Sequence, residues 1–319
     1  MKRALLVGID QYDNFTQLGG CVNDVTALHP LLARNEDDSP NLDCRLATAP
    51  KTGRPVRRDS LLGMLDDLLS PGSDFALFYF AGHGMPQNGD VALVTSDGTA
   101  ATPGVKFIEV LNRIVHSDVK ETVVVLDCCF SGGATTIAAL GNDQAVLPKG
   151  TTVLTASRGD QYSMETADGR GQFSTYFEGA LDGGAADVLG KVNISGLYAY
   201  LAESFGAWEQ RPTLKANIDR LHNIRECAPR VPLKVLRKIT QWFPSPNYNL
   251  PLDPSYEPTE QPANAENEAV FSGLQKYRAC RLIEPVGEDH LYYAALNSAG
   301  CILTPLGKHY WHLVKAGRV

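Results

Sequence analysis

The chain has 319 residues, of which 44% are hydrophobic and 20% charged, a globular composition that excludes a wholly disordered chain. Its formal net charge of −7 gives no support to a global role in binding nucleic acid or a membrane surface, and no apolar run is long enough to span a bilayer. The seven cysteines lack disulfide-like or metal-ligand spacing, so we expect a protein of the reducing cytoplasm.

Strand and helix patterns alternate over residues 1–222. Short apolar runs predict buried strands at Ala4–Ile9, Cys44–Ala47, Phe75–Phe80, Thr122–Leu126 and Thr151–Thr155. Apolar residues at helical spacing predict helices at Asp24–Ala33, Asp59–Leu69, Lys106–His116, Phe173–Leu181 and Ile194–Phe205. Strands joined by helices of this length predict a three-layer α/β/α sandwich around a mostly parallel sheet.

Composition changes sharply at residue 244, where six prolines fall within residues 244–262. This segment predicts an extended, poorly packed linker. After it, the patterns predict a helix, two strands joined by a turn, and a last helix, at Asn267–Ile283, Leu291–Leu296, Cys301–Thr304 and Leu306–Lys315. We therefore expect a large domain at 1–243, a Pro-rich linker at 244–266 and a small domain at 267–319.

Two predicted strands run directly into glycine-flanked reactive residues. One leads into Ala81-Gly82-His83-Gly84, and the other into Asp127-Cys128-Cys129. The carboxyl ends of parallel strands open on one edge of a sheet, so a histidine and a cysteine there could act as base and nucleophile. The alternative is structural: a turn histidine, and a cysteine that is a small buried hydrophobe. The pattern alone leaves both interpretations about equally open.

A set of segments occurs in one order across residues 1–215: ALLVGIDQY at 4–12, LGGCVNDV at 18–25, FYFAGHG at 78–84, LDCCFSGG at 126–133, TASRGDQYSME at 155–165 and GQFSTYFEGAL at 171–181. With these segments the sequence resembles the caspase-like cysteine peptidases, and among them the metacaspases and their prokaryotic relatives. The Q-A-C-x-G signature is absent, so the resemblance is to the broader superfamily and not to the Asp-specific animal caspases.

The resemblance implies a catalytic role for each residue of the motif. Cys129 would be the nucleophile and His83 its partner, and the backbone N–H groups of Gly84 and Cys129 would form the oxyanion hole. Only one of two adjacent strand-end residues can point toward substrate, and the preference for Cys129 over Cys128 rests on the motif. No third member of a triad is evident in the sequence.

The resemblance also places Asp24 and Asp127 in the pocket for the residue before the cut, with Cys21 nearby. Two carboxylates in one pocket favour Arg or Lys. Animal caspases instead hold aspartate with arginines, and no basic residue stands at these two positions. The structural alternatives are a helix cap for Asp24 and a solvated strand end for Asp127.

No cofactor is expected to be required. Many metacaspases bind calcium through acids outside the active site, but Asp90 and Asp97 do not complete a ligand set, so the metal site is unassigned and calcium dependence stays open.

Lys149 is the single basic residue of the Gly132–Gly150 stretch, which makes it a candidate site of chain processing. The alternative is an ordinary loop that stays intact.

Residues 276–317 resemble the second half of a winged-helix domain. Residues 260–319 hold six Lys or Arg and six Asp or Glu, so the tail lacks the basic patch that nucleic-acid binding needs and instead suits a regulatory protein partner. Our leading hypothesis is a regulated cysteine endopeptidase that cleaves after Arg or Lys, for which the resemblance to bacterial relatives implies a role in a stress or antiviral response. The alternatives are an inactive caspase-like scaffold that docks partners through its tail and, disfavoured by charge, a transcription regulator.

Overall fold

The structure is a computed structural model that describes residues 1–87, 89–130, 147–156, 169–205 and 212–319, with the backbone alone at 129 and 130. The chain forms two compact units. Unit 1 contains residues 1–186 and 191–227, and unit 2 contains residues 187–190 and 228–319. Within the described ranges, no helix combines the length and apolar character that a membrane span requires.

Unit 1 is built on one large sheet with the order β2-β1-β3-β6-β7-β9. All neighbours pair in parallel except β9, which is antiparallel to β7. This confirms the predicted α/β fold with a mostly parallel sheet. The strands of unit 1 are β1 Lys2–Ile9, β2 Asp43–Ala49, β3 Phe75–Gln87, β4 Asp90–Val94, β5 Gly104–Lys106, β6 Glu121–Phe130, β7 Thr151–Thr155, β8 Lys191–Asn193, β9 Thr213–Asn217 and β10 Asn223–Glu226.

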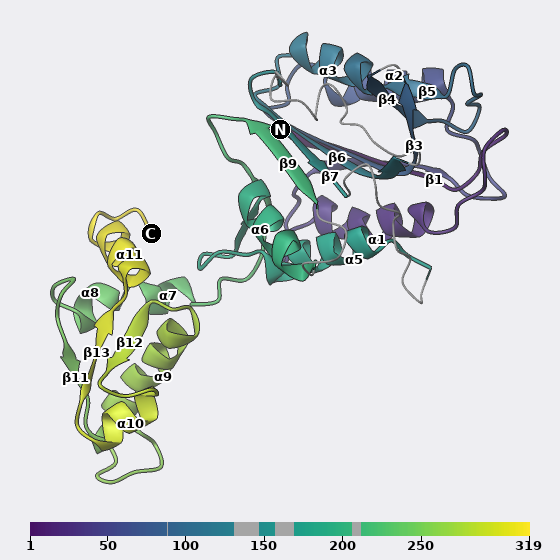
Figure 1. Cartoon of the computed structure of the whole chain (residues 1–319). Helices are drawn as coiled ribbons and strands as arrows, with labels where there is room; N and C mark the ends of the chain where they lie inside the picture. The colour runs from purple at the N-terminus through teal and green to yellow at the C-terminus, as the bar shows by residue number, and fades with distance from the viewer. Residues whose placement is uncertain (88, 131–146, 157–168, 206–211) are drawn as a thin grey trace. The chain divides into compact units, whose positions relative to one another are not determined.

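Helices cover both faces of this sheet, giving the three predicted layers (Figure 1). Side chains of α2 and α3 pack on one face, and those of α1, α5 and α6 pack on the other. The helices of unit 1 are α1 Cys21–Ala33, α2 Arg58–Leu68, α3 Phe107–Val115, α5 Gln172–Gly179, the π-helical turn η1 Ala180–Gly184, and α6 Ile194–Ser204.

The central strand β3 is longer than the sequence indicated. Its apolar run ends at Phe80, but the strand continues to Gln87, because β4 pairs with its extension from Gly84 onward in antiparallel fashion. His83 therefore lies within a strand and not in a loop after one. Along the same stretch β6 pairs with β3 in parallel, which brings His83 into register with Cys129.

Unit 2 begins earlier than predicted, and its Pro-rich segment is folded. Leu236, Phe243 and Leu252 are all buried in the core of unit 2. The Trp311 indole N–H also donates a hydrogen bond of 2.6 Å to the Phe243 carbonyl oxygen. The predicted boundary at 243 and the predicted linker at 244–266 are therefore wrong, because apolar residues between the prolines anchor the segment.

The elements of unit 2 are α7 Leu233–Leu236, α8 Ile239–Trp242, β11 Leu250–Pro251, the 3₁₀ turn η2 Pro254–Tyr256, α9 Ala265–Ala279, β12 Ile283–Val286, α10 Leu291–Leu296, β13 Gly300–Leu303 and α11 Pro305–Lys315. The three strands form an antiparallel sheet in the order β11-β13-β12. The predicted helices near 267–283 and 306–315 are confirmed as α9 and α11.

The predicted strand at Leu291–Leu296 is wrong, because this segment is the helix α10. Its buried residues, Leu291, Ala294 and Ala295, follow helical spacing and not the alternation of a strand. The strands β12 and β13 do pair antiparallel, yet a helix and not a turn connects them. The predicted pair of strands joined by a turn, Leu291–Leu296 with Cys301–Thr304, is therefore not formed.

Candidate active site

His83 is held by the residues that follow β1. Its Nε2 atom lies 2.8 Å from the Thr16 carbonyl oxygen, and its backbone N–H donates to the Tyr12 hydroxyl at 2.9 Å. The ring also packs against the tilted ring of Tyr12, with centroids 4.8 Å apart, and lies near Phe15. A carbonyl oxygen can only accept, so Nε2 carries the proton, and in the neutral ring Nδ1 is free to take one.

Tyr12 and Thr16 are functional candidates that the sequence did not single out. The Tyr12 hydroxyl donates to the Ile9 carbonyl oxygen at 3.0 Å, which fixes the ring against β3. A Cβ atom at Gly82 would lie 2.7 Å from that hydroxyl, so the glycine allows this close approach. Tyr12 was visible in the motif ALLVGIDQY, but a backbone carbonyl such as that of Thr16 has no signature in sequence.

The two adjacent cysteines of β6 differ in their surroundings. Cys128 is 1% exposed and packs in the core between the sheet and the α2 and α3 helices. The side chain of Cys129 lies outside the described residues, so its place is given by the backbone register, which pairs Cys129 with His83. A buried Cys128 thiol cannot reach a protein substrate, which gives the preference for Cys129 a physical argument.

Asp24 and Asp127 lie close together in the layer between the sheet and α1. Asp24, in the first turn of α1, is 3% exposed, and Asp127, on β6, is 9% exposed. A Cβ atom at Gly171 would be 3.2 Å from Asp24 Oδ2 and 3.7 Å from Asp127 Oδ2, so both carboxylates face one point. The structure thus brings together the two residues that the sequence predicted to share a pocket.

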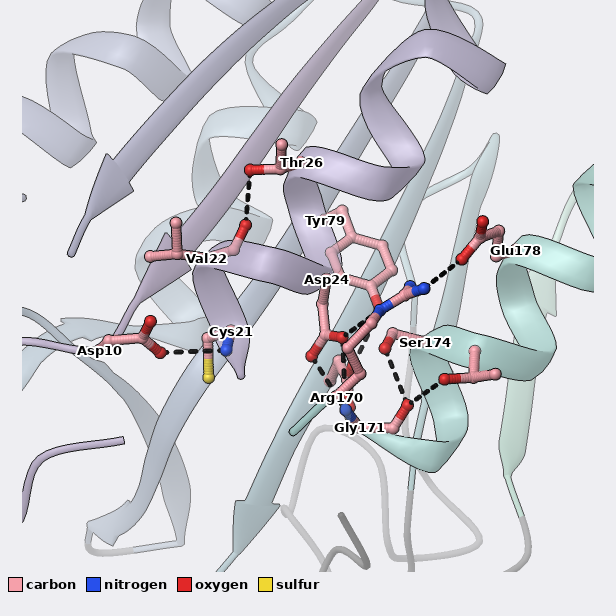
Figure 2. A network of polar contacts seen from close by, with 12 residues as sticks. Asp10, Cys21, Val22, Asp24, Thr26, Tyr79, Arg170, Gly171, Ser174 and Glu178 are labelled. Carbon is pink, nitrogen blue, oxygen red and sulfur yellow. Dashed lines mark hydrogen bonds and ion pairs between the residues drawn. The ribbon is translucent and has the colours of Figure 1, made fainter. Parts of the chain in front are cut away.

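Each carboxylate has partners of its own, and Figure 2 shows those of Asp24. The Tyr79 hydroxyl donates to Asp127 Oδ2 at 2.8 Å. Asp24 accepts from the Gly171 backbone N–H at 3.3 Å and pairs with Arg170 Nε at 3.2 Å. Asp24 does not cap α1, because the first backbone N–H of that helix, from Cys21, donates to Asp10 at 3.0 Å. The alternatives of a helix cap for Asp24 and a solvated strand end for Asp127 are therefore not what the structure shows.

Burial makes the ionised forms of these acids costly. Burial, and then the neighbouring Asp24, raises the pKa of Asp127 to about 7. Burial also raises the pKa of Asp24 above its ordinary value, against hydrogen bonds that include those of Ser174 and Arg170. The pKa of the Cys21 thiol is raised well above its usual range, first by burial and then by Asp10. Cys21 is therefore a neutral neighbour of the acids, and a bound cation would stabilise the pair.

Asp127→Asn is expected to alter how stability depends on pH. Folding raises the pKa of Asp127 from 3.8 to about 7, so the folded state binds the proton more tightly and wild-type stability falls as pH rises between these values. Between pH 4 and pH 8 the free energy of unfolding of the variant, relative to that of the wild type, should rise by a few kcal/mol, about 4 at most. Urea unfolding of both proteins at each pH measures the shift, and an unchanged difference would contradict the assignment.

The remaining predicted residues lie apart from this cluster. Lys149 is exposed and pairs with Asp219 at 2.9 Å, and the next residue, Gly150, donates its N–H to the Asn217 carbonyl oxygen at 2.7 Å. The Lys149–Gly150 peptide is thus part of a hydrogen-bonded turn beside β7. Residues 132–146 of the proposed processing stretch, and residues 157–165 of the TASRGDQYSME motif, lie outside the described residues.

Asp90 and Asp97 each serve local backbone structure. Asp90 accepts from the Ile108 N–H at 3.2 Å, and Asp97 accepts from the Arg58 N–H at 3.1 Å. Among the residues that the structure describes, no group of three His, Cys, Asp or Glu side chains is placed to hold a metal ion. Asp90 is thus the first residue of β4, and Asp97 lies in the turn after that strand.

Comparison with known proteins gives a family match over unit 1. The sequence model described as "Caspase domain" matches residues 1–220. Metacaspase-7 of Arabidopsis thaliana is 29% identical over 149 residues, which cover 41% of this chain and 35% of the relative. Metacaspase-1 of Plasmodium falciparum (isolate 3D7) is 33% identical over 154 residues, which cover 43% of this chain and 25% of the relative. The matched segments thus span about a third or less of these relatives.

Two solved structures resemble the chain. Caspase-1 from Spodoptera frugiperda has a TM-score of 0.48 and 12% identity, with 71% of this chain and 90% of that one covered. Protein GSU0716 from Geobacter sulfurreducens has a TM-score of 0.48 and 12% identity, with 67% and 92% covered.

Proposed function

The chain belongs to the caspase-domain family of cysteine peptidases, whose model matches residues 1–220, and on this premise we propose that it is an endopeptidase that cleaves protein chains after Arg or Lys. The observation that carries the proposal is the register of β3 and β6, which sets His83 opposite Cys129. Beside this pair the same strand, β6, carries Asp127 next to Asp24 of α1.

The reaction would proceed by covalent catalysis. The Cys129 thiolate attacks the scissile carbonyl carbon, and the backbone N–H groups of Gly84 and Cys129 stabilise the oxyanion. The His83 imidazolium gives its Nδ1 proton to the departing amine, which leaves an acyl-thioester on Cys129. Water, deprotonated by His83, then attacks the thioester and releases the acid product and the thiolate. The Thr16 carbonyl accepts from Nε2 throughout, so it holds the ring with Nδ1 available.

Specificity would follow from the buried acids. Asp24 and Asp127 face one point, and a substrate guanidinium placed there would form charge-assisted hydrogen bonds in a region of low dielectric. A substrate aspartate would instead place a third carboxyl group beside two buried acids, at a further cost of burying charge. The observation therefore favours a cleavage site after a basic residue, with Cys21 as a neutral wall of the pocket.

The alternative function is an inactive caspase-like scaffold. A thiol-reactive peptide probe that carries arginine separates the two, with peptide mass spectrometry to locate the adduct. Labelling of Cys129 in the wild type, and its absence in His83→Ala, would support the peptidase. Failure of the folded wild-type protein to react would support the scaffold.

We propose that unit 2 docks a regulatory protein. Its surface carries exposed apolar side chains on and near α10, among them Tyr293 and Leu296. Such side chains fit a protein partner better than a phosphate backbone, and the balanced charge of residues 260–319 agrees. A role in a bacterial stress or antiviral response stays a prediction at the level of the family.

We propose that the enzyme works without a cut at Lys149. The peptide bond after Lys149 belongs to a turn held by Gly150 and Asn217, so a peptidase could reach it only after the turn opened. Intact mass after incubation of the active enzyme should show one chain of full length. A fragment ending at Lys149, present in the wild type and missing in Cys129→Ala, would contradict the prediction and show self-processing.

A further inference from the structure

The acidic pair already has an arginine of this chain beside it. Arg170 directly precedes Gly171 and α5, and its Nε lies 3.2 Å from Asp24 Oδ1 (Figure 2). The Arg170 side chain is itself largely buried, at 20% exposure, and the Asp24 side chain beside it is 4% exposed. The carboxylate proposed to bind a substrate side chain is therefore covered and charge-paired within the chain.

A second acid holds Arg170 in this position. The Nη1 atom of Arg170 lies 2.5 Å from Oε2 of Glu178, which is near the C-terminal end of α5. The guanidinium thus bridges Asp24 of α1 and Glu178 of α5, as the dashed lines of Figure 2 show. Two anchors on two different helices keep the cation over Asp24.

We propose that Arg170 is an internal competitor for the substrate pocket, which a substrate Arg or Lys must displace from Asp24. The inference rests on the proposed function, because it takes Asp24 as part of that pocket. A substrate guanidinium and the Arg170 guanidinium have the same charge and the same hydrogen-bonding groups, so they repel each other at one buried carboxylate and compete for it. Arg170 therefore lowers the affinity of the enzyme for basic substrates by the fraction of time that it occupies Asp24.

Removing the competitor should strengthen binding. Arg170→Gln keeps much of the side-chain length but loses the charge, so it should tighten binding of a guanidinium about tenfold, since charge-assisted hydrogen bonds of this kind are strong. Glu178→Gln removes one anchor and leaves Arg170 in place, so it should act in the same direction by a smaller factor. If the ion pair of Arg170 had only a structural role, neither substitution would tighten binding of the guanidinium.

The experiment measures binding of agmatine, a guanidinium without a carboxylate, to the full chain by calorimetry. Every protein carries Cys129→Ala, so the result does not depend on catalysis. The control is Arg113→Gln, which removes an arginine that pairs with Asp66 at 2.8 Å outside the site. Thermal unfolding of each variant shows that it is folded, and the more exposed Glu178 gives a second variant should Arg170→Gln fail to fold.

The expected result is tightest binding in Arg170→Gln, intermediate binding in Glu178→Gln, and equal binding in Arg113→Gln and the Cys129→Ala parent. If agmatine binds the parent and the folded Arg170 and Glu178 variants bind it no more tightly, Arg170 is a structural residue and the inference fails while the acidic pocket stands. If agmatine binds none of the proteins, the acidic pocket of the proposed function fails, and the inference fails with it.

Discussion

Cys129→Ala is expected to lower the rate of cleavage of arginyl peptides by roughly a thousandfold or more, because it removes the atom that attacks the carbonyl. His83→Ala should be nearly as inactive, since the thiolate then lacks its proton donor for the leaving amine. Steady-state hydrolysis of a fluorogenic Arg peptide, with circular dichroism to show that the variants are folded, measures both effects.

The neighbouring cysteine provides a matched control. Cys128 is buried in the core, so Cys128→Ala should cost about 1 kcal/mol of stability and leave most of the activity. A folded Cys128→Ala protein without activity, beside an active Cys129→Ala protein, would reverse the assignment of the nucleophile.

Asp24→Asn and Asp127→Asn are each expected to raise the Michaelis constant for Arg peptides tenfold to a hundredfold, with a much smaller change in kcat. A hydrogen bond to a charged group contributes about 1.5–3 kcal/mol, and each variant removes one carboxylate from the point that both acids face. Rates measured over a range of peptide concentrations separate the two constants.

Asp66→Asn is the control for these substitutions, because Asp66 is an exposed acid whose partner is Arg113 on the surface. The effect on the Michaelis constant should not come from unfolding, since Asp127→Asn is expected to gain stability at neutral pH. An unchanged Michaelis constant in both pocket variants would mean that the acids serve the fold alone.

The buried strands of unit 1 could be predicted from sequence because each has a continuous apolar run. β7 lies where the sequence predicted it, at Thr151–Thr155, and β1 was predicted within two residues. The shorter β5, Gly104–Lys106, and the edge strand β9, Thr213–Asn217, carry no such run, since one is three residues long and the other is only half-buried. Unit 2 was predicted less well because its proline-rich segment resembles a linker in composition, while Phe243 and Leu252 pack in its core.

The site could be predicted where reactive side chains carry a motif. The placement of Asp24 beside Asp127 followed from the resemblance, and their burial did not, because it depends on α5 packing against α1. The bridge from Arg170 to Asp24 and Glu178 joins residues far apart in the chain, and neither pattern nor spacing indicates it. The Thr16 carbonyl likewise becomes a partner of His83 only through the path of the chain after β1.

Profiling of a peptide library, with every residue type before the cut, tests the central claim most directly. The full chain is incubated with the library with and without calcium, beside Cys129→Ala, and the new termini are identified by mass spectrometry. We predict cuts after Arg and Lys that Cys129→Ala does not make. Cuts after Asp, or the same cuts made by Cys129→Ala, would contradict the acidic pocket in the first case and the nucleophile in the second.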